Sequence, residues 1–269
     1  MEQLTLETRS PGVAVLTLDR PDRLNALSQV LIGELHDVFD QLAADRSTTV
    51  VVLTGAGRGF CAGVDLQEMG SAEGSEALRG PMRGMATQEH LSTLITHIRR
   101  IPQPVIAAVN GAAVGGGMAL ACACDVRVAS ASARFGTQFI KVGVSGCDVG
   151  ISYTLPRLVG ASRAFELILT GRIIGAEEAE RIGLVSRVTA DGEVVDAAVE
   201  VAEIIAGHSP FGVWMTKEVL WANLDAPNVE TAMHLEDRTQ ILAINTGDFK
   251  EAAAAFVEKR PPRFGGWDT

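Results

Sequence analysis

Hydrophobic positions along the chain fall into short runs that alternate with longer stretches of helical spacing. Residues 50–54 and 104–109 are almost continuously apolar, which is typical of strands buried on both faces of a sheet. Shorter strand-like runs lie at 13–18, 126–129 and 184–188. Apolar residues with the spacing of one helix face lie at 28–42, 85–99, 118–124 and 161–169. This alternation predicts an α/β protein with parallel strand pairing.

Beyond residue 193 the strand-like runs stop, and only helical patterns follow. The expected helices are 196–207, 210–224, 229–244 and 249–260. We therefore predict an α/β core over residues 1–193 and a helical C-terminal arm over residues 194–269. Helices with too little core of their own must bury their apolar face against a neighbour, so the arm predicts an oligomer.

The stretch 105–124 carries no charged side chain and is long enough to span a bilayer. It also contains many alanines and the triplet Gly115 to Gly117, which would break a spanning helix. A buried strand, a glycine turn and a buried helix explain the stretch better. We therefore predict no membrane association for this segment.

Composition narrows the function classes further. The 269-residue chain is 47% hydrophobic, which excludes a disordered protein, and its formal net charge of −10 argues against nucleic acid and anionic membranes as partners. Four cysteines without a CxxC pair and five scattered histidines predict neither a disulfide framework nor a metal site. The N-terminus lacks an apolar signal-peptide core, and these features together predict a cytoplasmic protein.

Two glycine-rich segments, 54–66 and 110–118, each follow a predicted strand. The first has three interpretations: a dinucleotide-binding loop, a structural turn, or a loop whose backbone N–H groups stabilise an anion. Phe60 and Cys61 stand where dinucleotide-binding fingerprints need glycine, which argues against the first of these. The second segment opens an apolar helix, whose first N–H groups carry partial positive charge. Two such loops can each supply one N–H group to a single oxyanion.

In these loops and in several other motifs the chain resembles the enoyl-CoA hydratase/isomerase (crotonase) family over nearly its full length. The matching motifs occur in the family's order, at residues 20–27, 59–66, 104–111, 115–117, 124–126, 155–160, 169–171, 177–185 and 256–260. The resemblance implies a crotonase-like spiral of ββα turns with a helical C-terminal oligomerisation arm that forms trimers, often paired into hexamers. It also implies acyl-CoA thioester substrates, with coenzyme A as part of the substrate and no metal or redox cofactor.

The resemblance also implies roles for particular residues. The backbone N–H groups of Val64 and Gly116 would hold the thioester oxygen as it gains enolate charge, and one such donor typically contributes about 2.7–4 kcal/mol. Gln67 stands where some members have a lysine that contacts phosphate. The implied contacts with coenzyme A are Arg23, Leu24, Ala62, Asp65, Leu66 and, near the C-terminus, Lys259. A solvated surface charge remains the alternative for Arg23 and Lys259.

The chain departs from the family's hydratases, which place two glutamates around a water molecule. Ala119 and Phe139 occupy those two positions here, so a two-carboxylate hydration mechanism cannot run on them. Asp148 resembles the catalytic aspartate of the dienoyl-CoA isomerases and of the aromatic-acyl-CoA dehalogenases in the same superfamily. One carboxylate beside an acyl chain can take a proton at one carbon and return it at another. The alternative is that Asp148 caps the helix that follows it.

We therefore expect an acyl-CoA enzyme that works through a thioester enolate, with a double-bond shift by Asp148 favoured over hydration. Two alternatives stay open: an enoyl-CoA hydratase whose second acid lies elsewhere, and a non-catalytic acyl-CoA binder. Glu89 and His90 face either the pocket or solvent, and the other histidines show no constellation. Residues 70–90 are expected to line the far end of the acyl pocket, with 70–84 as a mobile loop.

Overall fold

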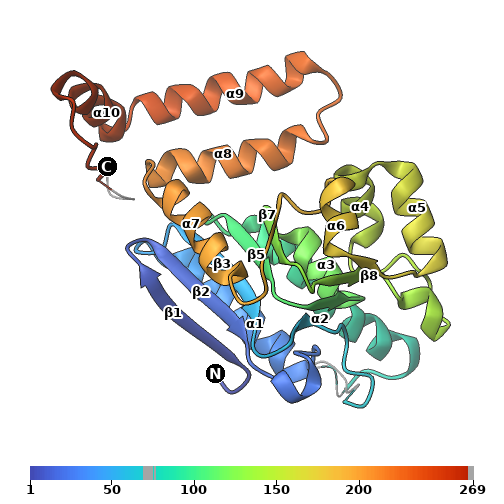
Figure 1. Ribbon diagram of the computed structural model, residues 1–269. Helices are drawn as coiled ribbons and strands as arrows, with labels where there is room; N and C mark the ends of the chain where they lie inside the picture. Colours follow the sequence, from blue (N-terminus) through green and yellow to red (C-terminus); the bar gives the residue numbers. More distant parts are fainter. Residues whose placement is uncertain (69–74, 76, 266–269) are drawn as a thin grey trace.

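The buried apolar runs form the centre of a six-stranded sheet in the computed structural model, which describes residues 1–68, 75 and 77–265 (Figure 1). Each strand pairs in parallel with its neighbours, except that the edge strand β1 pairs antiparallel with β2. In spatial order the strands are β1 (Leu4–Ser10), β2 (Val13–Leu18), β3 (Val50–Gly55), β5 (Val105–Val109), β7 (Val126–Ser130) and β10 (Arg187–Thr189). The predicted α/β fold with parallel pairing is confirmed.

Two strands of this six-stranded sheet differ from their sequence prediction. β1 was not predicted, because it is an edge strand whose side chains are mostly exposed and polar. β10 begins at Arg187, whereas the apolar run begins at Leu184. The backbone N–H groups of Leu184 and Val185 donate to the Ala179 carbonyl, so these two residues still belong to the turn before the strand.

Each of three long strands is followed by a short strand of a second sheet. β4 (Gly59–Cys61) follows β3, β6 (Ala112–Val114) follows β5, and β8 (Arg134–Gly136) follows β7. The order of this sheet is β4–β6–β8–β9, with β9 (Ile174–Gly175) antiparallel at the edge. A helix then returns the chain to the first sheet, so the unit ββα repeats along the core. Two or three residues are too few to show a period, and the short strands were therefore not predicted.

Both faces of the long sheet are covered (Figure 1). In β3, Val51 and Leu53 join the core beneath α1, α2 and α3, while Val50 and Val52 join a second core beneath α7. This burial explains why the strand is a continuous apolar run. The helices of this part of the chain are α1 (Gln29–Ala44), α2 (Gly80–Arg100), α3 (Gly116–Ala123), α4 (Ile151–Val159), α5 (Ala161–Thr170), α6 (Ala176–Arg181) and α7 (Val194–Ala206), with 3-10 turns η1 (Pro21–Arg23) and η2 (Phe139–Val142).

The stretch 105–124 forms β5, β6 and the eight-residue helix α3, of which all eight residues are buried. Among the residues that the structure describes, no helix is long and apolar enough to cross a membrane. Helix α4 was missed, because it is short and contains Pro156, a residue that usually ends a helix.

The C-terminal part has two different environments. Helix α7 packs against β3, β5 and β7 of the sheet, whereas α8 (Pro210–Asn223), α9 (Val229–Ile244) and α10 (Gly247–Glu258) project from it (Figure 1). We call these three helices the projecting arm. The division of the chain at residue 193 remains a prediction. Helix α7 lies after residue 193 in the sequence, but its contacts are with strands of the six-stranded sheet.

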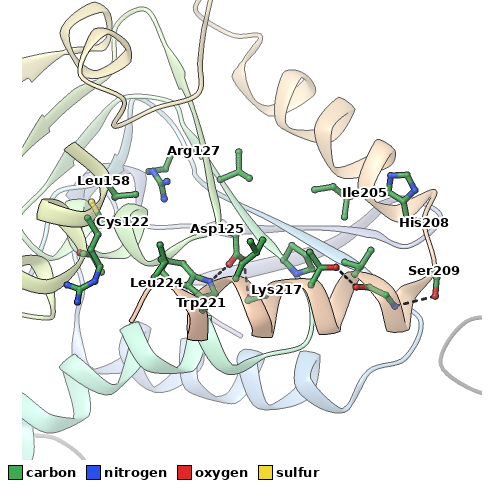
Figure 2. A pocket seen from close by; sticks show the side chains of 18 residues that line it. Cys122, Asp125, Arg127, Leu158, Ile205, His208, Ser209, Lys217, Trp221 and Leu224 are labelled. Atoms are coloured by element: carbon green, nitrogen blue, oxygen red, sulfur yellow. Dashed lines mark hydrogen bonds and ion pairs between the residues drawn. The ribbon is translucent and has the colours of Figure 1, made fainter. Parts of the chain in front are cut away.

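A buried ion pair fixes α8 to the core. Lys217 Nζ donates to the carbonyls of Ile98 and Gln103 and lies 3.1 Å from Asp125 Oδ2, while Trp221 Nε1 donates to Asp125 Oδ1 at 2.6 Å (Figure 2). Burial lowers the pKa of Lys217, and the charge of Asp125 opposes this shift. Every donor of this ammonium group has an acceptor, so the lysine serves as an attachment point.

Glycine is required where successive turns of the core touch. A Cβ built on Gly111 would lie 2.1 Å from the Arg58 oxygen, and one on Gly117 would lie 1.9 Å from the Cys61 oxygen. Neither carbonyl can move without breaking the stacking of one turn on the next. The chain backbones are therefore in direct contact at β4, β6 and the start of α3.

We expect Gly117→Ala to lower the free energy of unfolding by at least about 3 kcal/mol, because the new methyl group meets a backbone oxygen. The matched control is Gly33→Ala in α1, where a Cβ meets nothing within 4 Å. There alanine should stabilise the helix by about 0.5–1 kcal/mol. Urea denaturation of both variants measures the difference, and equal effects at the two sites would contradict the packing argument.

Candidate active site

The two predicted oxyanion donors lie side by side, although 52 positions separate them in the sequence. A Cβ built on Gly116 would lie 3.8 Å from Val64 N, and one built on Gly63 would lie 3.2 Å from Gly116 N. Within the described part of the chain, no hydrogen-bond acceptor is found for either N–H group. Two unpaired N–H groups on adjacent backbone segments can donate to one oxygen atom.

Local structure holds these two N–H groups in place. The segment at Val64 is clamped to the chain before α1, because Leu27 N donates to Gly63 O at 2.7 Å and Asp65 N donates to Leu27 O at 3.0 Å. Gly63 has a φ of +91°, and a Cβ there would lie 2.8 Å from Val114 O. Gly116 is the first residue of α3, so its N–H group belongs to the positive end of the helix.

Five of the residues predicted to contact coenzyme A form one patch on two paired segments. Ala62 N donates to Leu24 O at 3.0 Å, which joins the η1 turn to the loop after β4. Arg23 Nη2 lies 3.1 Å from Asp65 Oδ1, and Leu66, beside Asp65 in the sequence, is 63% exposed. The two paired segments thus place the cationic side chain of Arg23 and the exposed apolar side chain of Leu66 next to the loop that contains Val64.

Asp65 is a buried anion held by two arginines. Its carboxylate accepts from Arg20 Nη1 at 3.2 Å, from Arg23 Nη2 at 3.1 Å and from Gln67 N at 3.1 Å. Burial raises the pKa of this carboxyl, but the hydrogen bonds from Arg23, Gln67 N–H and Arg20 outweigh burial and hold the pKa of Asp65 below its ordinary value. The Asp65 side chain therefore fixes the two segments to each other.

Asp148 lies on the loop between η2 and α4, and its side chain is not an N-cap. The cap of α4 is Gly150, and no side chain accepts from the first turn of this helix. Asp148 Oδ1 instead accepts from Gln88 Nε2 at 2.5 Å and from Val149 N at 2.7 Å. The capping alternative is therefore wrong, and the half-buried carboxylate contacts helix α2.

A sizeable cavity lies away from these predicted site residues. It has a volume of about 690 Å³ and lies between α8 and the core, next to the Lys217–Asp125 pair (Figure 2). None of the residues that line it is a predicted site residue. Burial raises the pKa of the Cys61 thiol to about 12, which keeps this thiol protonated near neutral pH although it lies close to Val64 in the sequence.

A family model described as enoyl-CoA hydratase/isomerase matches residues 8–267. The chain belongs to the enoyl-CoA hydratase/isomerase family. The resemblance seen in the sequence motifs is thereby confirmed, and an acyl-CoA substrate is consistent with this family.

Individual relatives cover nearly the whole chain. A probable enoyl-CoA hydratase of Mycobacterium leprae is 46% identical over 96% of this chain and 88% of its own length. The crystal structure of a probable enoyl-CoA hydratase/isomerase from Mycobacterium abscessus is 41% identical, covers 98% of each chain and has a TM-score of 0.92. A monofunctional enoyl-CoA isomerase from Mycobacterium smegmatis is 42% identical over 87% of this chain and 99% of its own, with a TM-score of 0.74.

In this enoyl-CoA hydratase/isomerase family member, apolar side chains occupy both positions where the hydratases were expected to carry glutamate. Ala119 is fully buried in α3, three residues after the Gly116 N–H group. Phe139 is 8% exposed, and its ring edge lies 3.7 Å from a Cβ built on Gly115. The immediate surroundings of the glycine triplet are therefore apolar.

Lys259, the sixth predicted coenzyme A contact, is not brought to the patch within one chain. It is the exposed C-cap residue of α10, at the end of the projecting arm, away from the β4 and α3 loops (Figure 1). Its predicted role therefore requires a second chain.

Of the predicted mobile loop 70–84, residues 70–74 and 76 lie outside the described residues.

The prediction that the other histidines have no constellation is wrong for His36 and His97. His36 Nδ1 lies 3.0 Å from His97 Nδ1, and the ring of His36 stacks on that of His90 at 4.8 Å between centroids. His97 Nε2 in turn lies 2.9 Å from Asp40 Oδ1. His90 therefore contacts α1, while Glu89 is exposed. The sequence gives no signal for this cluster, because its members lie on two helices.

Two polar residues at the site were missed. Arg20 opens a family motif, but its buried ion pair with Asp65 depends on a contact across 45 positions. Gln88 precedes the buried residues Leu91 and Ile95 by three and seven positions on α2. Gln88 is itself exposed, and this helical spacing, which aligns it with two buried residues, is the signal that was available.

We expect Asp65→Asn to lower the free energy of unfolding by about 1–3 kcal/mol at pH 7, since two charged hydrogen bonds are lost. The folded-state pKa of Asp65 is depressed, so its stabilisation is present above the unfolded pKa of about 3.9 and is lost as pH falls through the folded value. The gap between wild type and variant should therefore close in acid. Denaturation at pH 7 and pH 3, with the exposed Asp22→Asn as control, measures it; a constant gap would contradict the ion-pair argument.

Proposed function

We propose that this family member is an acyl-CoA isomerase that shifts a carbon–carbon double bond through a thioester enolate. The observation that carries the proposal is the pair of unpaired N–H groups at Val64 and Gly116, next to the apolar side chains at Ala119 and Phe139. With no acid at positions 119 and 139, Asp148 is the carboxylate assigned to proton transfer.

In the proposed step, Asp148 takes a proton from the carbon next to the thioester carbonyl of a 3-enoyl thioester. The electron pair of that C–H bond moves into the carbonyl, and the oxygen gains negative charge. The N–H groups of Val64 and Gly116 donate to this oxygen and lower the barrier. Asp148 then returns the proton at the far end of the conjugated system, which leaves a 2-enoyl thioester. The step is a proton transfer and uses no cofactor beyond the coenzyme A of the substrate.

Hydration is the second candidate function, because the relative that is 46% identical is named a probable enoyl-CoA hydratase. It requires a second acid outside positions 119 and 139. The name of the Mycobacterium smegmatis relative, an enoyl-CoA isomerase, supports the first candidate. A non-catalytic acyl-CoA binder is the third, since the oxyanion loops alone suffice for binding.

We propose that coenzyme A lies over the patch of Arg23, Leu24, Ala62, Asp65 and Leu66, with Lys259 supplied by a neighbouring chain. We further propose a homotrimer or a dimer of trimers. The projecting arm supports association, because α9 buries no residue in a single chain, and Phe256 and Val257 of α10 are 85% and 79% exposed. A cytoplasmic location stays a prediction from the sequence.

We expect purified protein to convert a 3-enoyl-CoA to the conjugated 2-enoyl-CoA, seen as a rise in ultraviolet absorbance. Asp148→Asn should lower this rate at least about a hundredfold and leave binding of acyl-CoA unchanged, because only the proton carrier is removed. The exposed Asp37→Asn in α1 is the matched control.

Mixing the protein with a trans-2-enoyl-CoA separates the three candidates. An absorbance that falls at an enzymatic rate indicates hydration and overturns the isomerase proposal. Tight binding of the thioesters with no turnover of either one indicates the non-catalytic binder. Full activity of Asp148→Asn would remove that residue from the mechanism even if isomerisation is observed.

We expect light scattering on the eluting protein to give the mass of three or six chains. Phe256→Glu should reduce that mass, because it places a charge on an exposed apolar side chain of the projecting arm. Arg181→Glu on α6, whose side chain is 70% exposed, is a control for a surface charge change elsewhere. A single-chain mass for the wild-type protein would contradict the oligomer proposal.

A further inference from the structure

Helix α2 turns one face toward the loop that carries Asp148. Leu91 and Ile95 of this face are buried. Gln88 precedes them by one and two helical turns and is exposed at the edge of this face. A Cβ built on Gly150 would lie 3.3 Å from Ile95 Cγ2, so the loop after Asp148 packs directly on α2. Gln88 is therefore carried to Asp148 by a helix whose position the core fixes.

Two donors meet at one oxygen of Asp148. Gln88 Nε2 donates to Oδ1 at 2.5 Å, and Val149 N donates to the same atom at 2.7 Å. The backbone at this point is constrained, because Val149 is buried and has a φ of +38°. For Oδ2, no partner is found among the residues that the structure describes. The two oxygens of one carboxylate thus have different environments.

We infer that Gln88 is a positioning residue that keeps Asp148 Oδ1 occupied, so that Oδ2 is the oxygen that moves the proton. This inference rests on the proposed function, in which Asp148 is the base. It goes beyond that proposal because it assigns the proton to one of the two oxygens and gives a role to a residue of a different helix.

The chemistry of the two groups supports this assignment. The lone pairs of Oδ1 that face Gln88 and Val149 are occupied by N–H donors, so a proton taken from the substrate goes to Oδ2. The amide of Gln88 does not titrate, and it can donate to Oδ1 whether Asp148 is ionised or protonated. Its hydrogen bond therefore limits rotation of the carboxyl group in both halves of the proton transfer. Fixed geometry of this kind raises the rate of the chemical step.

The test compares three variants in the isomerisation assay. Gln88→Met removes the donor but keeps the length of the side chain, and we expect kcat to fall about tenfold while KM and the thermal midpoint stay unchanged. Gln88→Glu places a second carboxylate against Asp148, and the acid limb of the pH–rate profile should move to higher pH. Gln41→Met on the exposed face of α1 is the matched control and should leave all three quantities unchanged.

Asp148→Asn, assayed beside these variants, distinguishes a failure of the positioning role of Gln88 from a failure of the proposed function. An inactive Asp148→Asn with wild-type kcat and pH profile in both Gln88 variants overturns the positioning role and leaves the proposed base in place. A fully active Asp148→Asn, or a wild-type protein without isomerase activity, overturns both. Loss of kcat in Gln88→Met together with an equal loss of thermal stability would assign Gln88 a structural role only, and would also overturn the inference.

Discussion

Direct contact between the backbones of successive ββα turns is the constraint on which the rest of this structure depends. At Gly111 and Gly117 a single methyl group would overlap a carbonyl oxygen of the preceding turn. The same contact brings the loop after β4 against the start of α3, and it is there that Val64 N and Gly116 N become neighbours. The unpaired N–H groups of the candidate site are thus a consequence of how the core packs, because no side chain stands between the turns.

In this arrangement the main-chain N–H groups that would stabilise an oxyanion are independent of the side chains that would carry a proton. The proposed oxyanion donors are main-chain atoms at Val64 and Gly116, so they persist whatever side chains surround them. In the proposed mechanism, the neighbouring side chains then determine which reaction the thioester enolate enters. In this chain Ala119 and Phe139 supply no proton carrier, and the carboxylate of Asp148 comes from a different loop. Fold and family are therefore compatible with more than one reaction, and these few side chains decide among them.

Buried charges position the loops and the arm. Asp65 joins Arg20 and Arg23 across the two segments of the patch proposed for coenzyme A, and Lys217 joins α8 to Asp125, which lies between α3 and β7. In each case all of the charged groups have hydrogen-bond partners, which is the condition under which a buried charge is tolerated. Such pairs restrict the relative orientation of the elements more strongly than apolar contacts do, because hydrogen bonds are directional.

The sequence by itself determined the elements with a strong period and the loops that require glycine. The strands at 50–54 and 104–109, the helix over 229–244 and the glycine triplet all report local burial or local backbone conformation, which neighbouring residues reveal. Motif order also placed Val64 and Gly116, which the structure brings together. Only the tertiary structure decided the contacts of polar side chains on separate elements: Gln88 with Asp148, His36 with His97, and the distance of Lys259 from the patch. These contacts depend on the angle at which helices pack, and no local pattern encodes that angle.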